Sequence, residues 1–474
     1  MSTLRLGTIP VGGSITSRHD DFANPVDVRS AFTSAMSAMY RNEVPLYGDL
    51  VRIVHGVNTA LLSQQPNSTK ETLLSQRLDM ERHGAIRLGT PYELRTMARL
   101  FAVIGLKAVG YYDLSVTGLP MHATCFRPVD PESLSINPFR VFTTLLRPDL
   151  ISSTETRDLA INLLSRRNIF SSKLLDLINT AETQDWRLRI SEVDDFITEA
   201  MKTFSWRPEA SASEEEYRKL ANEHPILADI ASFKSAHINH LTPRTLDITR
   251  SHEQMRSEGL RVKDRIEGPP LRQCPILLRQ TSFLALEERI KFRDSHGVLV
   301  EGTHRARFGE IEERGAAVTV AGRKLYDKLL DKAMGQVRLS PASQSSEAMD
   351  IAMSEVFKEY PDSWPELRRN GLIYCTYHRA GKEIHHAAST ESLEDLVDQG
   401  YLIAEPITYE DFLPFSAAGI FASNLGSCQE ELIKDKISAD QKGFENALGY
   451  ALLDADELYR DIQHKSIMKC GLRL

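Results

Sequence analysis

The chain has 474 residues, of which 42% are hydrophobic and 26% are charged, a composition typical of a globular protein. Its formal net charge of −8 and pI near 6.0 leave no broad basic surface, which argues against nucleic acid or an anionic membrane as a partner. No apolar run approaches the roughly 20 residues of a membrane span, and the first residues lack the apolar core of a signal peptide. Five cysteines without a CxxC pair indicate a reducing compartment, so we expect a cytoplasmic protein.

The first part of the chain predicts two helices and then a strand–helix–strand–strand unit. Residues 1–25 show no periodic pattern and predict a flexible N-terminal lead, with one elaborated domain over residues 26–474. Thr90 is a good N-cap for the third helix, and Gly105 is suited to end it. In chain order, the predicted elements are helices over 26–42 and 46–65, a strand over 83–88, a helix over 90–105, and strands over 106–116 and 121–129.

A similar order of elements returns later in the chain and suggests a second, related module. Both module helices end in Gly-Leu, followed by Lys or Arg and a nearby Val. The two copies predict an α+β fold built on paired strand–helix–strand modules. The predicted elements of the second copy are a strand over 235–248, a helix over 249–260, and strands over 261–267, 276–286 and 304–315.

Helical patterns between the modules predict a large insertion at about residues 140–225. A mixed α/β portion is expected from about residue 330 to 474, with a short linker at 340–348. The predicted elements are helices over 156–167, 171–181, 192–204 and 323–334, and strands over 372–379 and 400–409.

Histidines at the starts of the two modules are candidate metal ligands. His83 and Arg87 lie on one side of either a helix or a strand, and two such groups need an anion, a metal ion or water between them. His237 and His240 open the second module; on a helix they would suit a zinc pair, but on a strand they point to opposite faces. We favour His240, which has apolar neighbours and precedes the predicted end of its strand, with His237 as the alternative.

The last strand of the second module contributes the candidate carboxylate. Glu310 and Glu312 share one face of that strand, so alternation cannot choose between them, and we favour Glu310. The segment GEIEERG also fits an exposed, charged strand near a hairpin. A set of His83, His240 and Glu310 would leave three positions open on an octahedral ion, which suits non-haem Fe(II) handling oxygen.

An arginine beside a cation suggests that an anion lies between them. Arginine grips a carboxylate with two parallel hydrogen bonds, so Arg87 predicts an acidic substrate chelated at its other end by the metal. The alternative for Arg87 is a structural salt bridge to Glu93. The segment 409–427 is rich in small and aromatic residues; the backbone near Phe415 and the hydroxyl of Ser416 are suited to contact a bound acid, although the segment also fits a buried loop.

Several separated motifs together resemble the 2-oxoadipate dioxygenase/decarboxylase family, also called 2-hydroxyglutarate synthase and formerly a domain of unknown function. The resemblance runs from about residue 30 to the C-terminus. It rests on the segments HGAIRLGTPYEL, GYYDLS, INHLTPRTLDI, GEIEERGAAVT, GRKLYD and DFLPFSAAGIFASNL.

The resemblance implies a vicinal-oxygen-chelate-like core of two βαβββ-type modules with large helical additions. It implies an enzyme that uses Fe(II) and O2 to convert 2-oxoadipate to 2-hydroxyglutarate and CO2 in lysine breakdown. By position, His83, His240 and a glutamate of GEIEERG look like the metal ligands, Arg87 like the catalytic arginine that binds the substrate carboxylate, and Phe415 and Ser416 like further substrate contacts.

Two other functions fit the same residues. One is a lyase, isomerase or hydrolase that uses another divalent metal at the same ligands, because this ligand set tolerates several ions. The other is a non-catalytic protein that binds a dicarboxylate. Oxygen uptake together with CO2 release would separate the dioxygenase from both.

Overall fold

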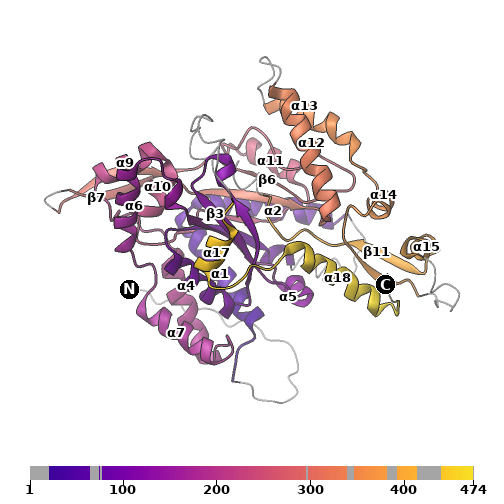
Figure 1. The fold of residues 1–474 in the computed structure, drawn as a ribbon, viewed down its shortest axis with the longest axis horizontal. Helices are drawn as coiled ribbons and strands as arrows, with labels where there is room; N and C mark the ends of the chain where they lie inside the picture. Colours follow the sequence, from indigo (N-terminus) through magenta and orange to yellow (C-terminus); the bar gives the residue numbers. More distant parts are fainter. Residues whose placement is uncertain are drawn as a thin grey trace.

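The computed structural model describes residues 21–64, 74, 77–294, 297–338, 346–381, 392–413 and 439–472 (Figure 1). Within these residues, seven strands form one mixed sheet in the order β2-β3-β4-β1-β5-β9-β6, and helices pack around it. The fold is therefore mixed α+β, as the sequence predicted. The strands of the sheet are β1 (Arg82–Leu88), β2 (Lys107–Asp113), β3 (Met121–Arg127), β4 (Arg140–Leu146), β5 (His240–Pro243), β6 (Leu278–Ser282) and β9 (Phe308–Arg314).

The two halves of the sheet repeat one pairing pattern on either side of the antiparallel β1–β5 pair. In the first half, β1 pairs parallel with β4, β4 antiparallel with β3, and β3 antiparallel with β2. In the second half, β5 pairs parallel with β9, and β9 antiparallel with β6. Val262 and Glu267 then make antiparallel bridges to Phe283 and Gln280, at the place that β2 occupies beside β3. The order of pairing agrees with the repeat seen in the sequence.

The first module forms almost as predicted, apart from its last strand. Helix α4 (Pro91–Val103) begins after Thr90, whose side chain accepts a hydrogen bond from the backbone N–H of Glu93, and Gly105 follows its end with φ of +72°. The predicted helical insertion was wrong at its start, because residues 140–146 form strand β4. The β-branched and aromatic sequence RVFTTLL suits a strand buried on both faces.

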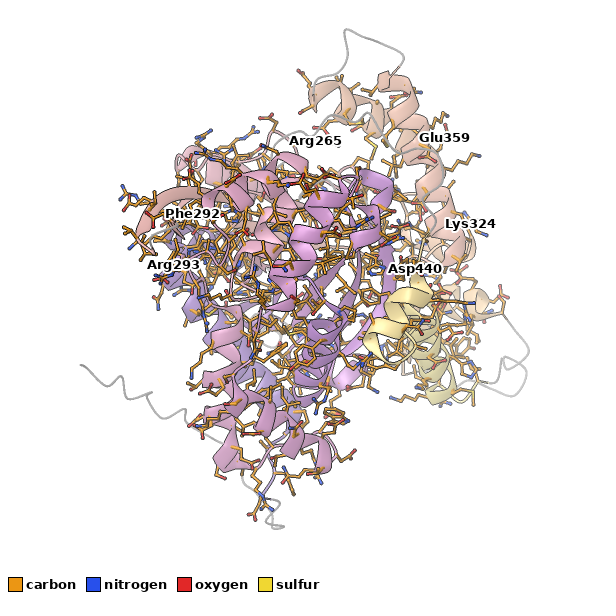
Figure 2. All side chains as sticks on the ribbon, turned by 60° about the vertical axis from the view of Figure 1, so that its left-hand side comes forward. Arg265, Phe292, Arg293, Lys324, Glu359 and Asp440 are labelled. Carbon is orange, nitrogen blue, oxygen red and sulfur yellow. The ribbon has the colours of Figure 1, made fainter. Side chains whose placement is uncertain are left out.

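The second module is less regular than predicted. Of the first predicted strand, residues 240–243 form β5 and Arg244 adds an isolated bridge to Glu312, while residues 261–267 make isolated bridges in place of a strand. The predicted strand over 304–315 is two strands: β8 (Leu299–Arg305) ends before β9 begins. With β7 (Glu287–Arg293), β8 forms a separate hairpin on which Phe292 is buried and Arg293 is exposed (Figure 2).

Alternation along β1 divides its side chains between two hydrophobic clusters. Ile86 and Leu88 face the cluster that includes residues of α1, α2, α4, α7 and α8, whereas Ala85 faces the cluster that includes residues of α6, α9 and α10. His83 and Arg87 share the side of Ala85. The helices are α1 (Pro25–Glu43), α2 (Pro45–Leu62), α6 (Thr154–Ser165), α7 (Ser172–Thr183), α8 (Val193–Phe204), α9 (Glu214–Glu223), α10 (Pro225–Ser232) and α11 (Ile248–Ser257).

The C-terminal part packs around its own hydrophobic cluster and contains both predicted strands, which pair as β10 and β11. Of the predicted linker, residues 340–345 lie outside the described residues, as do residues 1–20 of the predicted lead; Phe22 bridges to Arg189. No described helix combines the length and apolar character needed to cross a bilayer. The remaining elements are α5 (Pro131–Ile136), α12 (Val320–Arg338), α13 (Ser346–Val356), α14 (Trp364–Arg369), β10 (Cys375–Arg379), α15 (Leu393–Asp398), β11 (Leu402–Pro406), α17 (Gln441–Leu448), α18 (Ala455–Lys469) and short 3-10 helices at Ser115–Thr117, Pro148–Leu150, Ile190–Glu192 and Phe357–Glu359.

Tyr40 of α1 links the residue before β5 to the first residue of β9. Its buried hydroxyl donates to the carbonyl oxygens of Asn239, at 3.1 Å, and Phe308, at 2.7 Å. We expect Tyr40→Phe to lower the free energy of unfolding by about 1–2 kcal/mol, because it removes a buried donor from two carbonyl groups. Urea denaturation measures this change. An unchanged stability would show that the hydroxyl is dispensable at this junction.

Candidate metal centre

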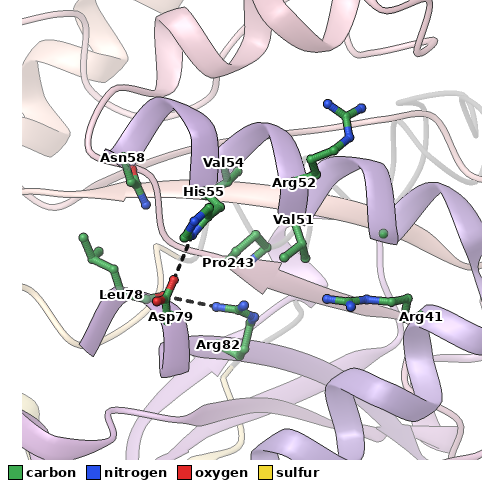
Figure 3. A pocket seen from close by; sticks show the side chains of 11 residues that line it. Arg41, Val51, Arg52, Val54, His55, Asn58, Leu78, Asp79, Arg82 and Pro243 are labelled. Carbon is green, nitrogen blue, oxygen red and sulfur yellow. Dashed lines mark hydrogen bonds and ion pairs between the residues drawn. The ribbon is translucent and has the colours of Figure 1, made fainter. Parts of the chain in front are cut away.

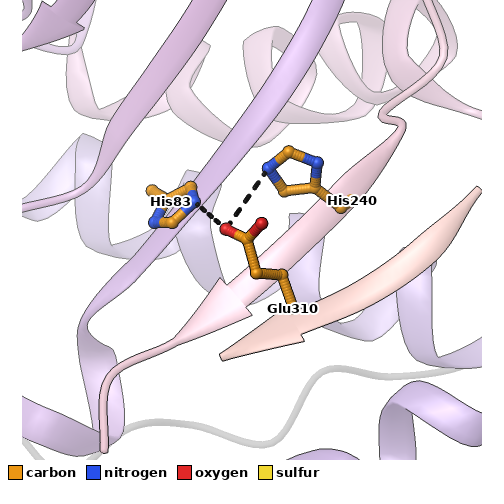
Figure 4. A group of neighbouring side chains, drawn as sticks. All are labelled: His83, His240 and Glu310. Carbon is orange, nitrogen blue, oxygen red and sulfur yellow. Dashed lines mark hydrogen bonds and ion pairs between the residues drawn. The ribbon is translucent and has the colours of Figure 1, made fainter. Parts of the chain in front are cut away.

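Three buried side chains from three neighbouring strands meet at one point of the sheet (Figure 4). His83 lies on β1, His240 begins β5, and Glu310 lies on β9. Oε1 of Glu310 is 2.9 Å from Nε2 of His83 and 3.9 Å from Nε2 of His240. One potential ligand atom from each residue lies within 4.8 Å of the other two. The structure thus brings together the three residues that the sequence analysis selected.

The donor set fits a divalent cation. Oε2 of Glu310 and Nδ1 of His240 are buried and have no hydrogen-bond partner among the described residues, although buried polar atoms are nearly always paired. Two imidazoles and a carboxylate are ligands that iron and other transition metals accept. A cation at this point would satisfy Oε2 of Glu310, a buried oxygen that the described part of the chain leaves without a hydrogen bond.

Glu312 lies behind His83, on the side away from Glu310. Its Oε2 is 3.2 Å from Nδ1 of His83, and its other oxygen accepts from Arg140 and, at 3.0 Å, from Nε of Arg314. Burial opposes ionisation, but Arg140 and His83 outweigh it and lower the pKa of Glu312 to about 2. A carboxylate at Nδ1 fixes the tautomer that turns the Nε2 lone pair toward Glu310, as in many metal sites. The geometry therefore separates the two glutamates that alternation left equivalent.

The two histidines of the centre experience opposite electrostatic surroundings. Burial tends to lower the pKa of His83, but the nearby carboxylates of Glu312 and Glu310 outweigh it and raise that pKa. Burial, with the positive charges of His83 and Arg87, holds the pKa of His240 well below its usual range. His240 is therefore a neutral donor, whereas a cation must displace a proton from His83.

The structure does not support the alternative interpretations of GEIEERG, His237 and the histidine pair. GEIEERG is a buried strand, so its interpretation as an exposed charged strand was wrong. His237 is not in the centre; it lies in a second cluster with Asp229 and His304. His240 begins a strand, so the two histidines do not form a zinc pair on a helix.

Arg87 is buried on the same side of β1 as His83, and its guanidinium forms an ion pair with Asp229 of α10. The alternative partner, Glu93, instead pairs with Arg167, so a salt bridge from Arg87 to Glu93 was the wrong expectation. The other predicted substrate contacts, Phe415 and Ser416, lie outside the described residues.

The sequence analysis missed Arg140, which is fully buried on β4 beside the centre. NH2 of Arg140 lies 3.5 Å from Nδ1 of His83, and its guanidinium lies 4.5 Å from the centroid of the Phe412 ring. The Phe412 ring in turn packs edge-on against His83. An arginine at the start of the apolar run RVFTTLL was the available signal, because a buried charge requires a partner.

A separate cavity of about 300 Å³ lies between α2 and the start of β1 (Figure 3). Arg41, Arg52 and Arg82 give it a basic lining, and His55 pairs there with Asp79 at 3.1 Å. None of His83, His240 and Glu310 lines it. This cavity is therefore distinct from the candidate metal centre.

Comparison with known proteins identifies the family. The sequence profile of the 2-oxoadipate dioxygenase/decarboxylase family matches residues 32–424. A 2-oxoadipate dioxygenase/decarboxylase from Pseudomonas putida is 45% identical over 96% of this chain and 98% of its own length, and one from Escherichia coli is 44% identical over 94% and 98%. The chain belongs to this family.

Solved structures agree with the assignment across the whole fold. The crystal structure of the hydroxyglutarate synthase from Pseudomonas putida in complex with 2-oxoadipate matches with a TM-score of 0.85 and 45% identity, over 95% of this chain and 99% of that chain. A second structure of the Pseudomonas putida protein has a TM-score of 0.82 and 42% identity. This family of enzymes therefore shares the fold described above.

The positions of the two glutamates predict different losses of metal in this family member. Glu310→Gln should abolish binding of a divalent cation at the candidate centre, because it removes the negative charge from the group of His83, His240 and Glu310. Glu312→Gln should weaken binding by roughly 10- to 100-fold and leave the site intact, since its carboxylate acts through His83. Anaerobic titration with Fe(II) measures both.

Glu313→Gln is the matched control for this pair. Glu313 is the next residue on β9, and its carboxylate accepts from the backbone N–H of Ile248 on the other face of the strand. Metal affinity should not change in this variant. If Glu312→Gln lost all metal and Glu310→Gln kept it, the roles of the two carboxylates would be reversed.

Proposed function

We propose that this protein is an Fe(II)-dependent dioxygenase/decarboxylase that converts 2-oxoadipate and O2 to 2-hydroxyglutarate and CO2 in lysine breakdown. The observation that supports this most directly is the buried set of His83, His240 and Glu310 in a chain of the 2-oxoadipate dioxygenase/decarboxylase family. The reaction balances with one O2 consumed for each CO2 released, because loss of C1 leaves a new carboxylate at C2 and the second oxygen atom becomes the product hydroxyl. No external reductant is needed.

The ligand set supports Fe(II) as the resident metal. His83, His240 and Glu310 would hold the ion, and a set of two imidazoles and one carboxylate with open positions is typical of non-haem Fe(II) oxygenases. When bound, Fe(II) supplies the redox chemistry and polarises the 2-oxo acid.

The chain's own side chains hold this ligand set in place. The hydroxyl of Thr242 donates to Oε1 of Glu310 at 3.2 Å, and Glu312 fixes the ring of His83. The rings of Phe412 and Phe308 pack on His83 and His240 and exclude water from them.

The placement of Arg87 supports its role as the catalytic arginine that binds the substrate carboxylate. Residues four apart on a strand are separated by roughly 13 Å between Cα atoms, so His83 and Arg87 face one space that a linear diacid can span. The guanidinium matches a carboxylate with two parallel hydrogen bonds. Phe415 and Ser416 remain proposed further contacts with the acid.

We also infer a vicinal-oxygen-chelate-like core of two βαβββ-type modules. The repeated pairing on either side of β1 and β5 supports it, as does a metal centre that draws one histidine from each half. The proposed catalytic unit spans residues 26–474, because Glu410 and Asp411 of the C-terminal part form buried ion pairs with Arg314 and Arg127.

Oxygen consumption tests the proposal against its two alternatives. With Fe(II) and 2-oxoadipate, we expect equal amounts of O2 uptake, CO2 and 2-hydroxyglutarate. Turnover with Zn²⁺, Ni²⁺ or Mn²⁺ in the absence of O2 would instead indicate a lyase, isomerase or hydrolase. Binding of 2-oxoadipate without turnover would indicate a dicarboxylate-binding protein.

Substitution of Arg87 tests its role separately from metal binding. Arg87→Ala should keep Fe(II) but lose about 10- to 100-fold or more in kcat/KM for 2-oxoadipate, the equivalent of roughly 1.5–3 kcal/mol for a charged hydrogen bond. Arg87→Lys keeps the charge beside Asp229 but not the planar fork, so it should lose most of the same activity while remaining folded. Undiminished turnover in both variants would rule out the role.

A further inference from the structure

Asp229 of α10 lies at the centre of a second buried cluster, next to the metal centre. Its Oδ1 accepts from Nε2 of His304 at 2.8 Å and lies 3.1 Å from Nε2 of His237. Its Oδ2 accepts from NH1 of Arg87 and, at 3.4 Å, from the side-chain amide of Asn239. Arg87, Asn239 and His304 donate to this carboxylate, and Nε2 of His237, which also lies 3.3 Å from the side-chain amide of Asn239, is the fourth nitrogen beside it. Polar groups therefore surround the carboxylate.

The charges of this cluster balance without a metal ion. Burial opposes ionisation of Asp229, but Arg87 and His237 outweigh it and hold the pKa of Asp229 well below its usual range. Burial lowers the pKa of His237, so its ring is neutral. One carboxylate and one guanidinium thus form a neutral pair. Hydrogen bonds from Arg87, Asn239 and His304 hold the carboxylate in this His–His–Asp group without a metal ion.

A separate structural element holds the far side of the cluster. His304 comes from β8 of the hairpin that lies outside the main sheet, and its Nδ1 lies 2.8 Å from the hydroxyl of Tyr217 on α9. Trp206 stacks on the ring of His304, and Phe292 of β7 packs against Tyr217. The hairpin and the helical insertion therefore meet at Asp229, the ion-pair partner of Arg87.

We propose that Asp229, held by His237 and His304, is a positioning residue that fixes the guanidinium of Arg87 before the substrate binds. The inference rests on the proposed function, because it assigns Arg87 to the substrate carboxylate. A guanidinium paired to a buried acceptor loses little freedom on binding a ligand, which favours affinity and alignment. The hairpin β7–β8 contributes to this role through the hydrogen bond between His304 and Asp229.

A double-mutant cycle between Asp229 and Arg87 tests this inference. Asp229→Asn keeps the shape of the side chain but replaces the carboxylate with an uncharged amide beside Arg87. The kcat/KM for 2-oxoadipate should therefore fall by about 10- to 100-fold, chiefly through a higher KM. In an Arg87→Ala background the same change should cost less than about 3-fold, because Asp229 acts only through Arg87. Fe(II) content should stay at one equivalent per chain in all variants.

Two further variants keep the test decisive if Asp229→Asn does not fold. His304→Phe keeps an aromatic ring but removes one donor from Asp229, and should raise KM in the same direction by a smaller factor. Glu394→Gln is the control: it removes the carboxylate partner of Arg368 in the C-terminal part, far from the cluster in sequence, and should leave KM unchanged.

The outcomes separate this inference from the proposed function. A wild-type protein without O2-dependent turnover of 2-oxoadipate would contradict the proposed function. The affinity for 2-oxoadipate without O2, compared between wild type and Asp229→Asn, would then still test whether Asp229 positions Arg87. Active wild type with unchanged KM in Asp229→Asn, or losses that multiply in the double variant, would overturn the positioning role. A second equivalent of metal that disappears in Asp229→Asn would show a metal site in its place.

Discussion

The antiparallel pairing of β1 with β5 is the constraint on which the candidate site depends. In its register His83 lies opposite Thr242 and Ala85 opposite His240. β9 then pairs parallel with β5, which brings Glu310 within hydrogen-bond distance of Thr242. Because side chains alternate along a strand, a slip of one residue in any of these pairings would turn a ligand to the other face. The three ligands, distant in sequence, are set by register alone.

Buried charge is the second constraint, and it explains why the C-terminal part belongs to the site. Glu312 needs partners at its buried position and finds them in Arg140 and Arg314. Arg314 also pairs with Glu410, from a segment almost a hundred residues later. Removing one member of such a network leaves an uncompensated buried charge, which costs far more than an exposed pair contributes. The network therefore ties the core and the C-terminal part into one unit.

The sequence predicted the local features of this protein better than its long-range pairings. The unit from β1 to β3 could be predicted from the alternation of side chains along its strands, from Thr90 as the N-cap of α4 and from Gly105 after the end of that helix. β4 was missed because an apolar run of this length has no period that separates a strand from a helix. The predicted strand over 235–248 was too long, because β5 contains only residues 240–243. Its length depends on pairing with distant strands, which the local sequence does not reveal.

In the candidate site, too, the local features could be predicted from the sequence and the long-range contacts could not. His83, His240 and Glu310 could be selected by position in the modules, but the choice of Glu310 over Glu312 needed the two nitrogens of His83, which only the folded sheet places. The partner of Arg87 could not be predicted, because Asp229 lies 142 residues away on helix α10. The local candidate Glu93 was instead engaged by another distant arginine, Arg167.

His83 and Arg87 lie on one strand, so under the proposed function the sheet contributes to the choice of substrate. The separation between the Cα atoms of His83 and Arg87 follows from the rise of a buried strand that pairs with β4 from His83 to Leu88 and with β5 from Arg82 to Ala85. Asp229 and the hairpin residue His304 limit the remaining freedom, that of the guanidinium itself. The length of the diacid is then set by the sheet. Under the proposed function, this spacing would match the two groups that hold the ends of the diacid to one length, and residues that contact its middle would add further selectivity.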